Sequence, residues 1–415
     1  MPKPEIEKTI VSIETNFSGL DQFLFNKNKG YLTVLVTDGF ERYNRWFPEE
    51  SLKKLKLVDC VIPVANSNDL DEVLAALKSH VKTFDAVITF AEIRTLVTAR
   101  VNQALGLRGT NPAAIEIAQD KHRFREVLCE KGVDTVKSIR VDSADALWEV
   151  RDEINFPCFI KPLQGHSSLG SVVCNNIADL ENHIPALKAI DEDWISQSFV
   201  IEDYLEGPLV SVEILTIAPG QHQVVGVSDR DVLNDSVEVG ASFPVVDEHR
   251  DAVVAKACAA LDAIGFDFGA SHVEIIVTSD GPHLVEVNTR PGGSGHTVML
   301  DLSTGRSIVG DCVELALGTL PSRRPLYQIE QGAAWKCFTS QKTGRIVSIP
   351  SFSAIKENTG VEEVWFHHEQ GDEIAGLNSN FSWIVQVMCT GKDRLEAKVN
   401  AARAIQFVEQ QTVIA

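Results

Sequence analysis

Two glutamates in the segment 272–293 could hold a divalent cation. The segment reads as two strands joined by a Ser-Asp-Gly turn at 279–281, which predicts a β-hairpin. With this three-residue loop, Glu274 lies directly opposite Glu286 on one face, with Cβ atoms about 5 Å apart. Two facing carboxylates repel each other, so the pair makes sense when a cation lies between them. The alternative is an ordinary hairpin whose charged face meets solvent.

The same register places other polar residues beside that cation. His272 lies opposite Asn288, and Arg290 shares the parity of Glu286 and Asn288. Oxygen ligands from Glu and Asn, with room for phosphate and water, suit Mg²⁺. A metal with a fixed positive charge beside it is what phosphoryl transfer needs. His272 is either a core hydrogen-bonding residue or a partner of the metal ligands.

A lysine and a small-residue loop precede this hairpin. A strand over 156–162 carries Lys161 near its end, and the loop 165–170 follows with Gly at both ends. A Walker A loop would continue with Lys and then Ser or Thr, but Ser171 and Val172 follow, which argues against a P-loop. The loop's N–H groups and hydroxyls could bind phosphate oxygens that Lys161 also reaches. The alternative is a plain turn with a surface lysine.

Other segments carry weaker signals. Lys121 starts a helix predicted over 121–131, and the strand 199–205 ends in acidic residues whose backbone could meet an adenine edge. Solvated side chains are the alternative for both. The two histidines at 367–368 precede a glutamate and could suggest a metal, but strand neighbours point to opposite faces, which favours a solvated surface. Ser294 lacks the GxSxG pattern of a nucleophile elbow, which disfavours a serine hydrolase.

Hydrophobic periodicity predicts the elements that position these residues. Strands at 31–36 and 85–90, with a helix at 68–80 between them, predict an open α/β domain over about residues 1–115. Thr-Asp-Gly-Phe follows the first of these strands in place of GxGxxG, which argues against a dinucleotide site. The later predicted elements are a strand at 209–217, helices at 247–264 and 306–317, strands at 332–338, 344–349, 361–366 and 382–389, and a final helix at 392–410.

Composition excludes several classes of protein. The chain has 415 residues and a net charge of −20, so nonspecific nucleic-acid binding is not expected. No apolar run is long enough for a transmembrane helix, and residues 1–10 lack the apolar stretch of a signal peptide. The 8 cysteines include no CxxC pair, which argues against structural zinc and a disulfide scaffold. Reduced thiols in a cytoplasmic protein are the expectation.

In their order along the chain, these pieces resemble the ATP-grasp superfamily over roughly residues 1–320. They are the small α/β domain, Asp-Lys at 120–121, FPCFIKP with its Gly/Ser loop, IEDYLEG at 201–207, and the hairpin with two Glu, Asn and Arg. The resemblance implies a fold of mixed α/β and α+β class, the ATP-grasp fold. Its implied parts are an N-terminal open α/β domain over 1–115, an ATP-grasp region over 116–320 with a mobile lid subdomain over about 135–205, and a small C-terminal α+β domain over 321–415.

The resemblance also implies roles for individual residues. ATP lies between two lobes together with Mg²⁺, one ion or two, for which Mn²⁺ can substitute. Leu209 stands where the family has a ribose-binding Glu, which leaves ribose recognition open, with Glu206 as a substitute. The implied residues are Lys121, Lys161, His166, Ser167, Ser168, Glu202, Asp203 and Leu205 for ATP, Glu274, Glu286 and Asn288 for the metal, and Arg290 with Lys161 for catalysis.

The residues after Arg290 indicate which group of ATP-grasp enzymes the chain resembles most. Pro-Gly-Gly follows in place of the Gln-Val-Glu-His of biotin-dependent carboxylases, and the Gly-rich N-terminal turn of purine-biosynthesis carboxylases is absent. Pro-Gly-Gly, the helix end Leu-Ala-Leu-Gly at 315–318 and the length of the tail are similar to the L-amino acid ligases. By this resemblance, Arg290 and Gly293 contact the substrate carboxyl group or its acyl phosphate. Arg230 either lines the amino-acid pocket or lies on the surface.

The implied function is an ATP-dependent carboxylate–amine ligase. It would form an amide or peptide bond between small amino-acid-like substrates through an acyl phosphate, releasing ADP and phosphate. Two alternatives stay open, namely a carboxylase of purine-type metabolism and a nucleotide-binding module without catalysis. The expected partners are small amino acids or carboxylic acids, with no nucleic acid and no membrane. Dimerisation is common in the family, so a homodimer is one expected assembly.

Overall fold

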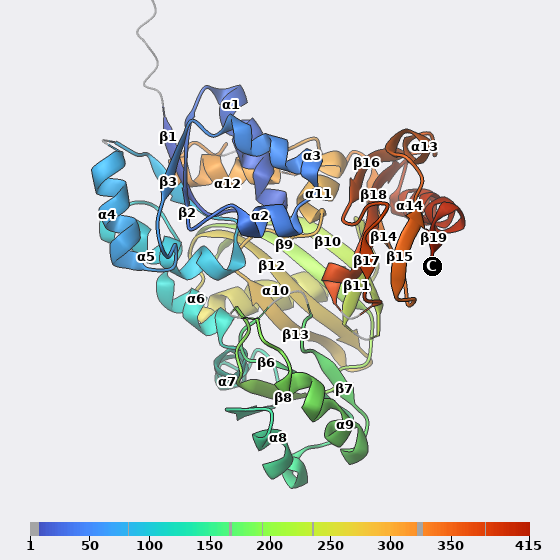
Figure 1. Ribbon diagram of the computed structural model, residues 1–415. Helices are drawn as coiled ribbons and strands as arrows, with labels where there is room; N and C mark the ends of the chain where they lie inside the picture. The colour runs from blue at the N-terminus through green and yellow to red at the C-terminus, as the bar shows by residue number, and fades with distance from the viewer. Residues whose placement is uncertain are drawn as a thin grey trace, which may run out of the picture.

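The computed structural model describes residues 8–81, 83–165, 168–192, 194–234, 236–321, 327–377 and 379–415. Their strands form four sheets: an N-terminal sheet, a long central sheet, a small sheet below it and a short sheet near the C-terminus (Figure 1). Two residues of the predicted ATP site, His166 and Ser167, lie outside the described residues. No helix among the described residues is long and apolar enough to cross a membrane.

The N-terminal sheet is parallel, with strand order β3-β2-β1-β4. The structure confirms the predicted strand–helix–strand pattern, but the prediction misses two strands of this sheet: β1, an inner strand of five residues, all buried, and β3. The elements are β1 (Thr9–Ile13), α1 (Asp21–Lys29), β2 (Leu32–Thr37), α2 (Glu41–Trp46), α3 (Glu49–Leu52), β3 (Cys60–Pro63), α4 (Leu70–His80), β4 (Ala86–Ile88) and α5 (Thr95–Leu105).

The central sheet is antiparallel, with order β13-β12-β9-β10-β11-β14-β18-β16. The prediction misses β10 and β11, which join its two halves. Because β11 pairs with β14, the last part of the chain extends this sheet; the domain limits at 115 and 320 stay predictions. The strands are β9 (Leu209–Ala218), β10 (Gln221–Leu233), β11 (Val237–Phe243), β12 (Gly269–Thr278), β13 (Gly281–Asn288), β14 (Gly332–Thr339), β16 (Val361–Phe366) and β18 (Trp383–Gly391).

The small sheet is antiparallel, with order β5-β8-β6-β7, and lies within the region predicted as a lid. The predicted phosphate loop belongs to the connection between β6 and β7, and β7 is an edge strand of this sheet. The elements are β5 (Ser138–Val141), α8 (Ala146–Glu149), β6 (Cys158–Pro162), β7 (Val172–Cys174), α9 (Ile177–Lys188) and β8 (Phe199–Asp203).

Three helices cover one face of the first half of the central sheet: α6 (Pro112–Gln119), α7 (Lys121–Glu130) and α10 (Arg250–Ile264). On β9, Val210, Val212 and Ile214 pack into the core beneath these helices. Strand side chains alternate between faces, so Ser211 and Glu213 lie on the opposite face. That second face holds polar residues and forms the floor of the site.

The remaining elements hold the N-terminal and C-terminal parts against the central sheet. Val313 and Ala316 of α12 pack with residues of the N-terminal sheet, and α14 packs through its alanines on β14 and β18. These elements are α11 (His296–Thr304), α12 (Ile308–Leu317), β15 (Gly344–Ser348), α13 (Phe352–Lys356), β17 (Glu373–Ile374), α14 (Arg394–Gln411) and β19 (Val413–Ile414), with 3-10 turns at Ser18–Leu20, Lys53–Leu57, Glu92–Arg94, Arg151–Glu153 and Asn380–Ser382.

Candidate active site

One cavity of about 700 Å³ lies between the central sheet, the small sheet and the N-terminal elements, and the C-terminal segment 367–383 completes its wall. The fold brings together residues that are far apart in the sequence. Every predicted site residue that the structure describes lines this cavity: Lys121, Lys161, Ser168, Glu202, Asp203, Leu205, Arg230, Glu274, Glu286, Asn288, Arg290 and Gly293.

The hairpin β12–β13 places Glu274 opposite Glu286 and His272 opposite Asn288, as its sequence predicts. All four side chains line the cavity. The intervening Val273 packs into the core under the helices. The alternation of this strand therefore separates a core face from a chemical face.

The turn of this hairpin differs from the prediction. Thr278 pairs with Gly281, so the turn has two residues, and the predicted three-residue loop at 279–281 is wrong. A shift of one residue would move every side chain of a strand to the other face. A β-bulge just after Glu274, with Val285 as the extra residue of β13, restores the register. The bulge is what keeps the two glutamates opposite each other.

The polar atoms on this hairpin suit a hard cation such as Mg²⁺. Asn288 Nδ2 donates to Glu286 Oε1 at 2.9 Å, and Arg290 Nη2 donates to Asn288 Oδ1 at 3.3 Å. The described residues contain no group of three or more His, Cys, Asp or Glu side chains placed to hold a metal. Two carboxylates and one amide oxygen would therefore share a cation with phosphate and water oxygens. Their role as ligands stays a prediction.

Arg230 is buried in the cavity wall, so the surface alternative for this residue is wrong. Its guanidinium forms an ion pair with Glu238, lies 3.6 Å from Glu274 Oε1, and donates to Ser211 Oγ at 2.6 Å. Burial raises the pKa of Glu274, but Arg230 and His272 outweigh burial and lower it to about 2. Glu274 is therefore a carboxylate at neutral pH.

His272 lies between two carboxylates. Its Nδ1 contacts Glu213, and its Nε2 lies 3.2 Å from Glu274 Oε1. Burial lowers the pKa of His272, but Glu213 reverses this effect and the pKa is raised. Gly292 N donates to Glu213 Oε2 at 3.2 Å, and a Cβ at Gly292 would lie 2.7 Å from Glu213 Oε1. The loop after Arg290 needs glycine here because its backbone packs onto the Glu213–His272 pair.

Glu202 of β8 is enclosed by two cations. Arg125 Nε lies 2.7 Å from its Oε1 and Lys161 Nζ 2.9 Å from its Oε2, and all three side chains are buried. Burial raises the pKa of Glu202, but Arg125 and Lys161 lower it to about 2. The Glu202 side chain is thus engaged by two cations, and the next hinge residues that line the cavity are Asp203 and Leu205.

Lys121 contacts the first residue of the predicted phosphate loop, Gly165, at the cavity wall. Lys121 Nζ donates to Gly165 O at 3.3 Å. Burial lowers the pKa of Lys121, against the opposing effect of Glu286. On the far side of the loop, Ser168 Oγ donates to Ser236 O at 2.6 Å, which ties the loop to the β10–β11 turn. Gly165 and Ser168 therefore each contact another residue of the cavity wall.

Ribose recognition is not explained by the predicted substitute. Leu209 lines the cavity, whereas Glu206 is exposed and is not a lining residue. Asp203 lines the cavity a short way upstream and offers a carboxylate in its place.

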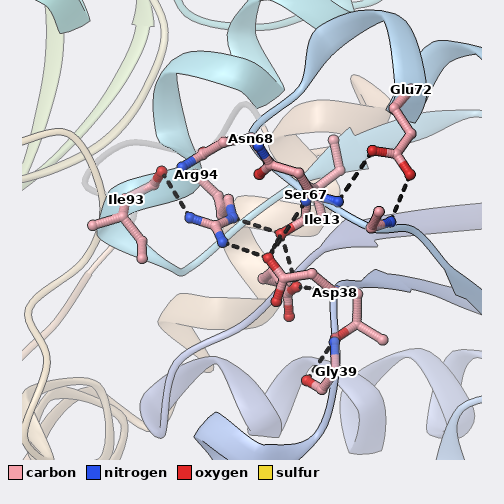
Figure 2. Close-up of polar contacts among 12 residues, drawn as sticks. Ile13, Asp38, Gly39, Ser67, Asn68, Glu72, Ile93 and Arg94 are labelled. Carbon is pink, nitrogen blue, oxygen red and sulfur yellow. Dashed lines mark hydrogen bonds and ion pairs between the residues drawn. The ribbon is translucent and has the colours of Figure 1, made fainter. Parts of the chain in front are cut away.

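The N-terminal elements contribute Glu92 to the site, a residue that the sequence prediction misses. It starts a 3-10 turn, and its Oε2 lies 2.7 Å from Arg290 Nε. Figure 2 shows how this turn is fixed: Arg94 donates to Ser67 Oγ and to Asp38 Oδ2, both at 2.7 Å. These three residues follow the ends of β4, β3 and β2, so the parallel sheet positions Glu92.

The C-terminal segment contributes two histidines to the cavity, which corrects the prediction of a solvated surface. His367 and His368 follow β16, and both of their backbone N–H groups donate to Ile384 O, at 2.9 and 3.3 Å. The two histidines lie beyond the end of the regular strand, so the rule that neighbouring side chains point to opposite faces does not apply to them. Both histidines line the cavity. His367 Nε2 lies 3.2 Å from Gln386 Oε1, and burial lowers the pKa of His367 to about 4.

Two of the residues that sequence reasoning missed carried a readable signal. Glu213 interrupts the apolar run of β9, and a glutamate inside a buried strand needs a partner. Arg125 follows Lys121 by one helical turn and so shares its face of α7. Glu92 and His367 carried no such signal, because no nearby residue in the sequence indicates what they contact.

Comparisons with known proteins identify the domains. Residues 154–298 match the ATP-grasp domain, and residues 336–413 match L-amino acid ligase C-terminal domain 2. An uncharacterised protein of Sinorhizobium fredii is 24% identical over 353 residues, which cover 83% of this chain and 72% of that protein. The alanine–anticapsin ligase of Bacillus subtilis is 25% identical over 234 residues, covering 50% of this chain and 49% of that enzyme. The chain thus aligns with about half of that ligase.

A solved structure shares the whole fold. The L-amino acid ligase from Bacillus licheniformis superimposes with a TM-score of 0.81 over 99% of both chains, at 19% identity. The residues matched by the ATP-grasp domain include Lys161, the hairpin β12–β13 and Arg290. The chain therefore carries an ATP-grasp domain over residues 154–298 and an L-amino acid ligase C-terminal domain 2 over residues 336–413, and it has the fold of that L-amino acid ligase.

Proposed function

We propose that the protein joins the carboxylate of one amino acid to the amine of another, through an acyl phosphate made with ATP. ADP and phosphate are released. The observation that carries this proposal is the ion pair between Glu92 and Arg290, at 2.7 Å, on the cavity wall beside the two facing glutamates. Both side chains are largely buried, at 19% and 13% exposed, so a ligand reaches them only inside the cavity.

An α-amino acid matches both members of this pair. Its ammonium group suits Glu92, and its carboxylate suits Arg290. Arg290 follows Asn288 by two residues, so a carboxylate held by Arg290 lies beside the predicted metal ligands. Bicarbonate and simple carboxylic acids have no ammonium group for Glu92. The pair therefore favours an amino acid as the activated substrate.

The cavity residues can support both steps of such a reaction. A carboxylate oxygen attacks the γ-phosphorus of ATP, and the bond between that phosphorus and ADP breaks. Lys121 and Lys161 hold phosphate oxygens, and Arg290 lies where charge develops. An amine nitrogen then attacks the acyl carbon, and phosphate leaves. Gly165, Ser168 and Leu169, which line the cavity, would limit access of water, which would otherwise hydrolyse the acyl phosphate.

Magnesium fits the hairpin because the available donors are oxygens and Glu274 is ionised at neutral pH. Glu274, Glu286 and Asn288 would hold it, and the bound ion would neutralise phosphate charge. The protein's own part is to keep these donors on one face through the bulge of β13 and to place Arg290 next to them.

Removal of divalent cations is expected to abolish ADP release, since the lysines and Arg290 alone cannot neutralise the phosphates. Dialysis against EDTA should reduce the rate to background, Mg²⁺ should restore it, and Mn²⁺ should restore part of it, because Mn²⁺ accepts similar oxygen ligands. ADP should be measured directly by chromatography, because coupling enzymes need Mg²⁺ themselves. Unchanged ADP release after complete chelation would contradict the metal assignment.

The proposed function is tested by incubating the protein with ATP, Mg²⁺ and pairs of the twenty amino acids. We expect ADP release with a subset of pairs and, by mass spectrometry, a product that equals the two substrates minus one water. ADP release that needs bicarbonate and no amine would favour a carboxylase. ATP binding without turnover on any pair would favour a non-catalytic module.

Replacing Glu92 by Gln should weaken binding of the activated amino acid. A lost charged hydrogen bond costs about 1.5–3 kcal/mol, so we expect its KM to rise about 10- to 100-fold, while the KM for ATP stays within about twofold. The matched control is Glu116→Gln, which removes the carboxylate of an exposed ion pair with Arg100 and should change neither KM. Equal effects of the two substitutions would count against the role of Glu92.

A further inference from the structure

The loop that follows Arg290 ends at His296, and one nitrogen of this imidazole has no hydrogen-bond partner among the described residues. His296 is 1% exposed and lines the cavity. Its Nδ1 lies 3.0 Å from Gly293 O, and a carbonyl only accepts, so Nδ1 carries the hydrogen. Burial, together with Arg230 and His272, lowers the pKa of His296 well below its usual value, so the ring is neutral. Its Nε2 is therefore an acceptor, and no described group donates to it.

The imidazole of a second cavity residue, His367, is held by Gln386 of β18. Gln386 is fully buried, and its Nε2 donates to Ser294 O at 2.6 Å. Its Oε1 therefore faces His367 Nε2, 3.2 Å away, which must carry the hydrogen. In the neutral ring this leaves Nδ1 of His367 as an acceptor. Gln386 thus links the loop after Arg290 to the C-terminal segment.

These two imidazoles belong to one row of rings. The centroids of His272 and His296 are 5.2 Å apart, those of His296 and Trp335 5.7 Å, and those of Trp335 and Trp383 and of Trp383 and His367 both 5.6 Å. The row starts beside Glu274 and runs to the C-terminal segment. It therefore leads from the predicted phosphoryl centre to the part of the cavity wall that Trp383 and His367 form.

We propose that His296, His367 and Trp383, three rings of this row that line the cavity, form the subsite of the second, amine-bearing substrate, with His296 Nε2 accepting an N–H of the attacking amine and His367 Nδ1 binding the rest of that substrate. The inference rests on the proposed ligase function and names the residues that would receive its nucleophile. Amines present N–H donors, and neutral acceptors bind them in a region where Arg230 and Arg290 would repel a cation. The indole of Trp383, which lines the cavity, favours an amine that also carries an apolar group.

The step at this subsite balances without another reactant. The ammonium form of the substrate first loses one proton to solvent. The neutral nitrogen then attacks the acyl carbon, the C–N bond forms, and the C–O bond to phosphate breaks. One N–H proton leaves with phosphate as hydrogenphosphate, and the amide keeps the other. His296 Nε2 directs the nitrogen lone pair toward the acyl carbon by holding one of its hydrogens.

Hydroxylamine separates this subsite from the activation step. Hydroxylamine is small and traps an acyl phosphate as a hydroxamate, so it needs no subsite for a second amino acid. The wild-type protein is first given ATP, Mg²⁺, hydroxylamine and each amino acid, which identifies the activated substrate. Hydroxamate and amide formation are then measured for His296→Phe and His367→Phe, which keep a ring in place but remove the acceptor.

We expect His296→Phe to keep hydroxamate formation within about threefold of the wild type and to lower kcat/KM for the amine about 10- to 100-fold, the range for leaving one buried N–H donor without its acceptor. His367→Phe should act mainly on the amine KM. The control is His249→Phe at an exposed histidine, which should change neither product. Retained hydroxamate formation also reports that each variant is folded.

Two results would overturn the proposal. Amide formation unchanged in both variants would show that neither imidazole contacts the amine. An equal loss of hydroxamate and amide would place the histidines in the activation step or in folding. Failure of the wild-type protein to form any hydroxamate or amide is a different result, because it rejects the proposed ligase function and this subsite with it.

Discussion

Replacement of Glu286 by Gln is expected to lower ADP release by at least about 100-fold, in the range found when one preorganised electrostatic group is removed from an active site. Glu286 is one of the two facing carboxylates, and Gln has the same size but no charge. Its side-chain oxygen can still accept from Asn288 Nδ2, which in the native chain donates at 2.9 Å. The substitution therefore removes charge from the predicted cation site and leaves the hairpin in place.

ADP release by Glu286→Gln should be measured over a range of Mg²⁺ concentrations, because a weakened cation site is partly compensated by more metal. Glu409→Gln, at an exposed position of α14, is the matched control and should behave as the wild type. Normal turnover of Glu286→Gln at all Mg²⁺ concentrations would remove the hairpin from the catalytic site and favour a non-catalytic nucleotide-binding module.

Arg125→Met is expected to lower the free energy of unfolding by about 3–5 kcal/mol, the usual cost of leaving one partner of a buried ion pair uncompensated. Arg125 is 2% exposed and binds Glu202 through two nitrogens. It also donates to the carbonyls of Leu284 and Val285, the latter at 3.2 Å. The variant would leave Glu202 with Lys161 alone and two buried carbonyls without this donor.

The control for this variant lies on the same helix. Arg123 forms ion pairs with Glu126 and Glu130 but is 46% exposed, and exposed pairs contribute about 0–1 kcal/mol. Urea unfolding of Arg123→Met should therefore stay close to the wild type. Similar midpoints for Arg125→Met and Arg123→Met would show that the buried pair does not stabilise the fold.

The contribution of Arg125 should depend on pH. Glu202 has a pKa of about 2 in the folded protein, below the value of about 4.3 for an unfolded glutamate. A lowered carboxylate pKa contributes stability above the unfolded pKa, and this contribution is lost as pH falls through the folded pKa. The stability difference between wild type and Arg125→Met should therefore be largest near neutral pH and shrink between about pH 4.3 and pH 2. A constant difference across that window would contradict this electrostatic origin.

The bulge of β13 explains why the facing pair Glu274 and Glu286 was predicted correctly although the turn length was predicted wrongly. A wrong turn length would normally shift the register and place Glu274 opposite the wrong residue. The facing pair was still correct because the structure moves the extra residue from the turn to Val285. Pattern reasoning specifies which residues share a face, but turn length and bulge position depend on packing across the whole sheet.

The sequence alone determined the chemical residue types and their local periodicity. The parity of Glu286, Asn288 and Arg290, the lysine before a small-residue loop, and the order of these motifs were enough to indicate a phosphoryl-transfer site. These features depend on short stretches of chain, where strand and helix geometry fixes which neighbours point the same way.

Only the tertiary structure decided which distant residues share the cavity and in what charge state. Glu92, Arg125, His296 and His367 reach the site from separate elements, and Glu202 proved to bind two cations. Burial and through-space pairing set these roles, and both depend on how the sheets pack against one another. No local pattern encodes that packing, so residue types could be read from the sequence while partners, tautomers and pKa values could not.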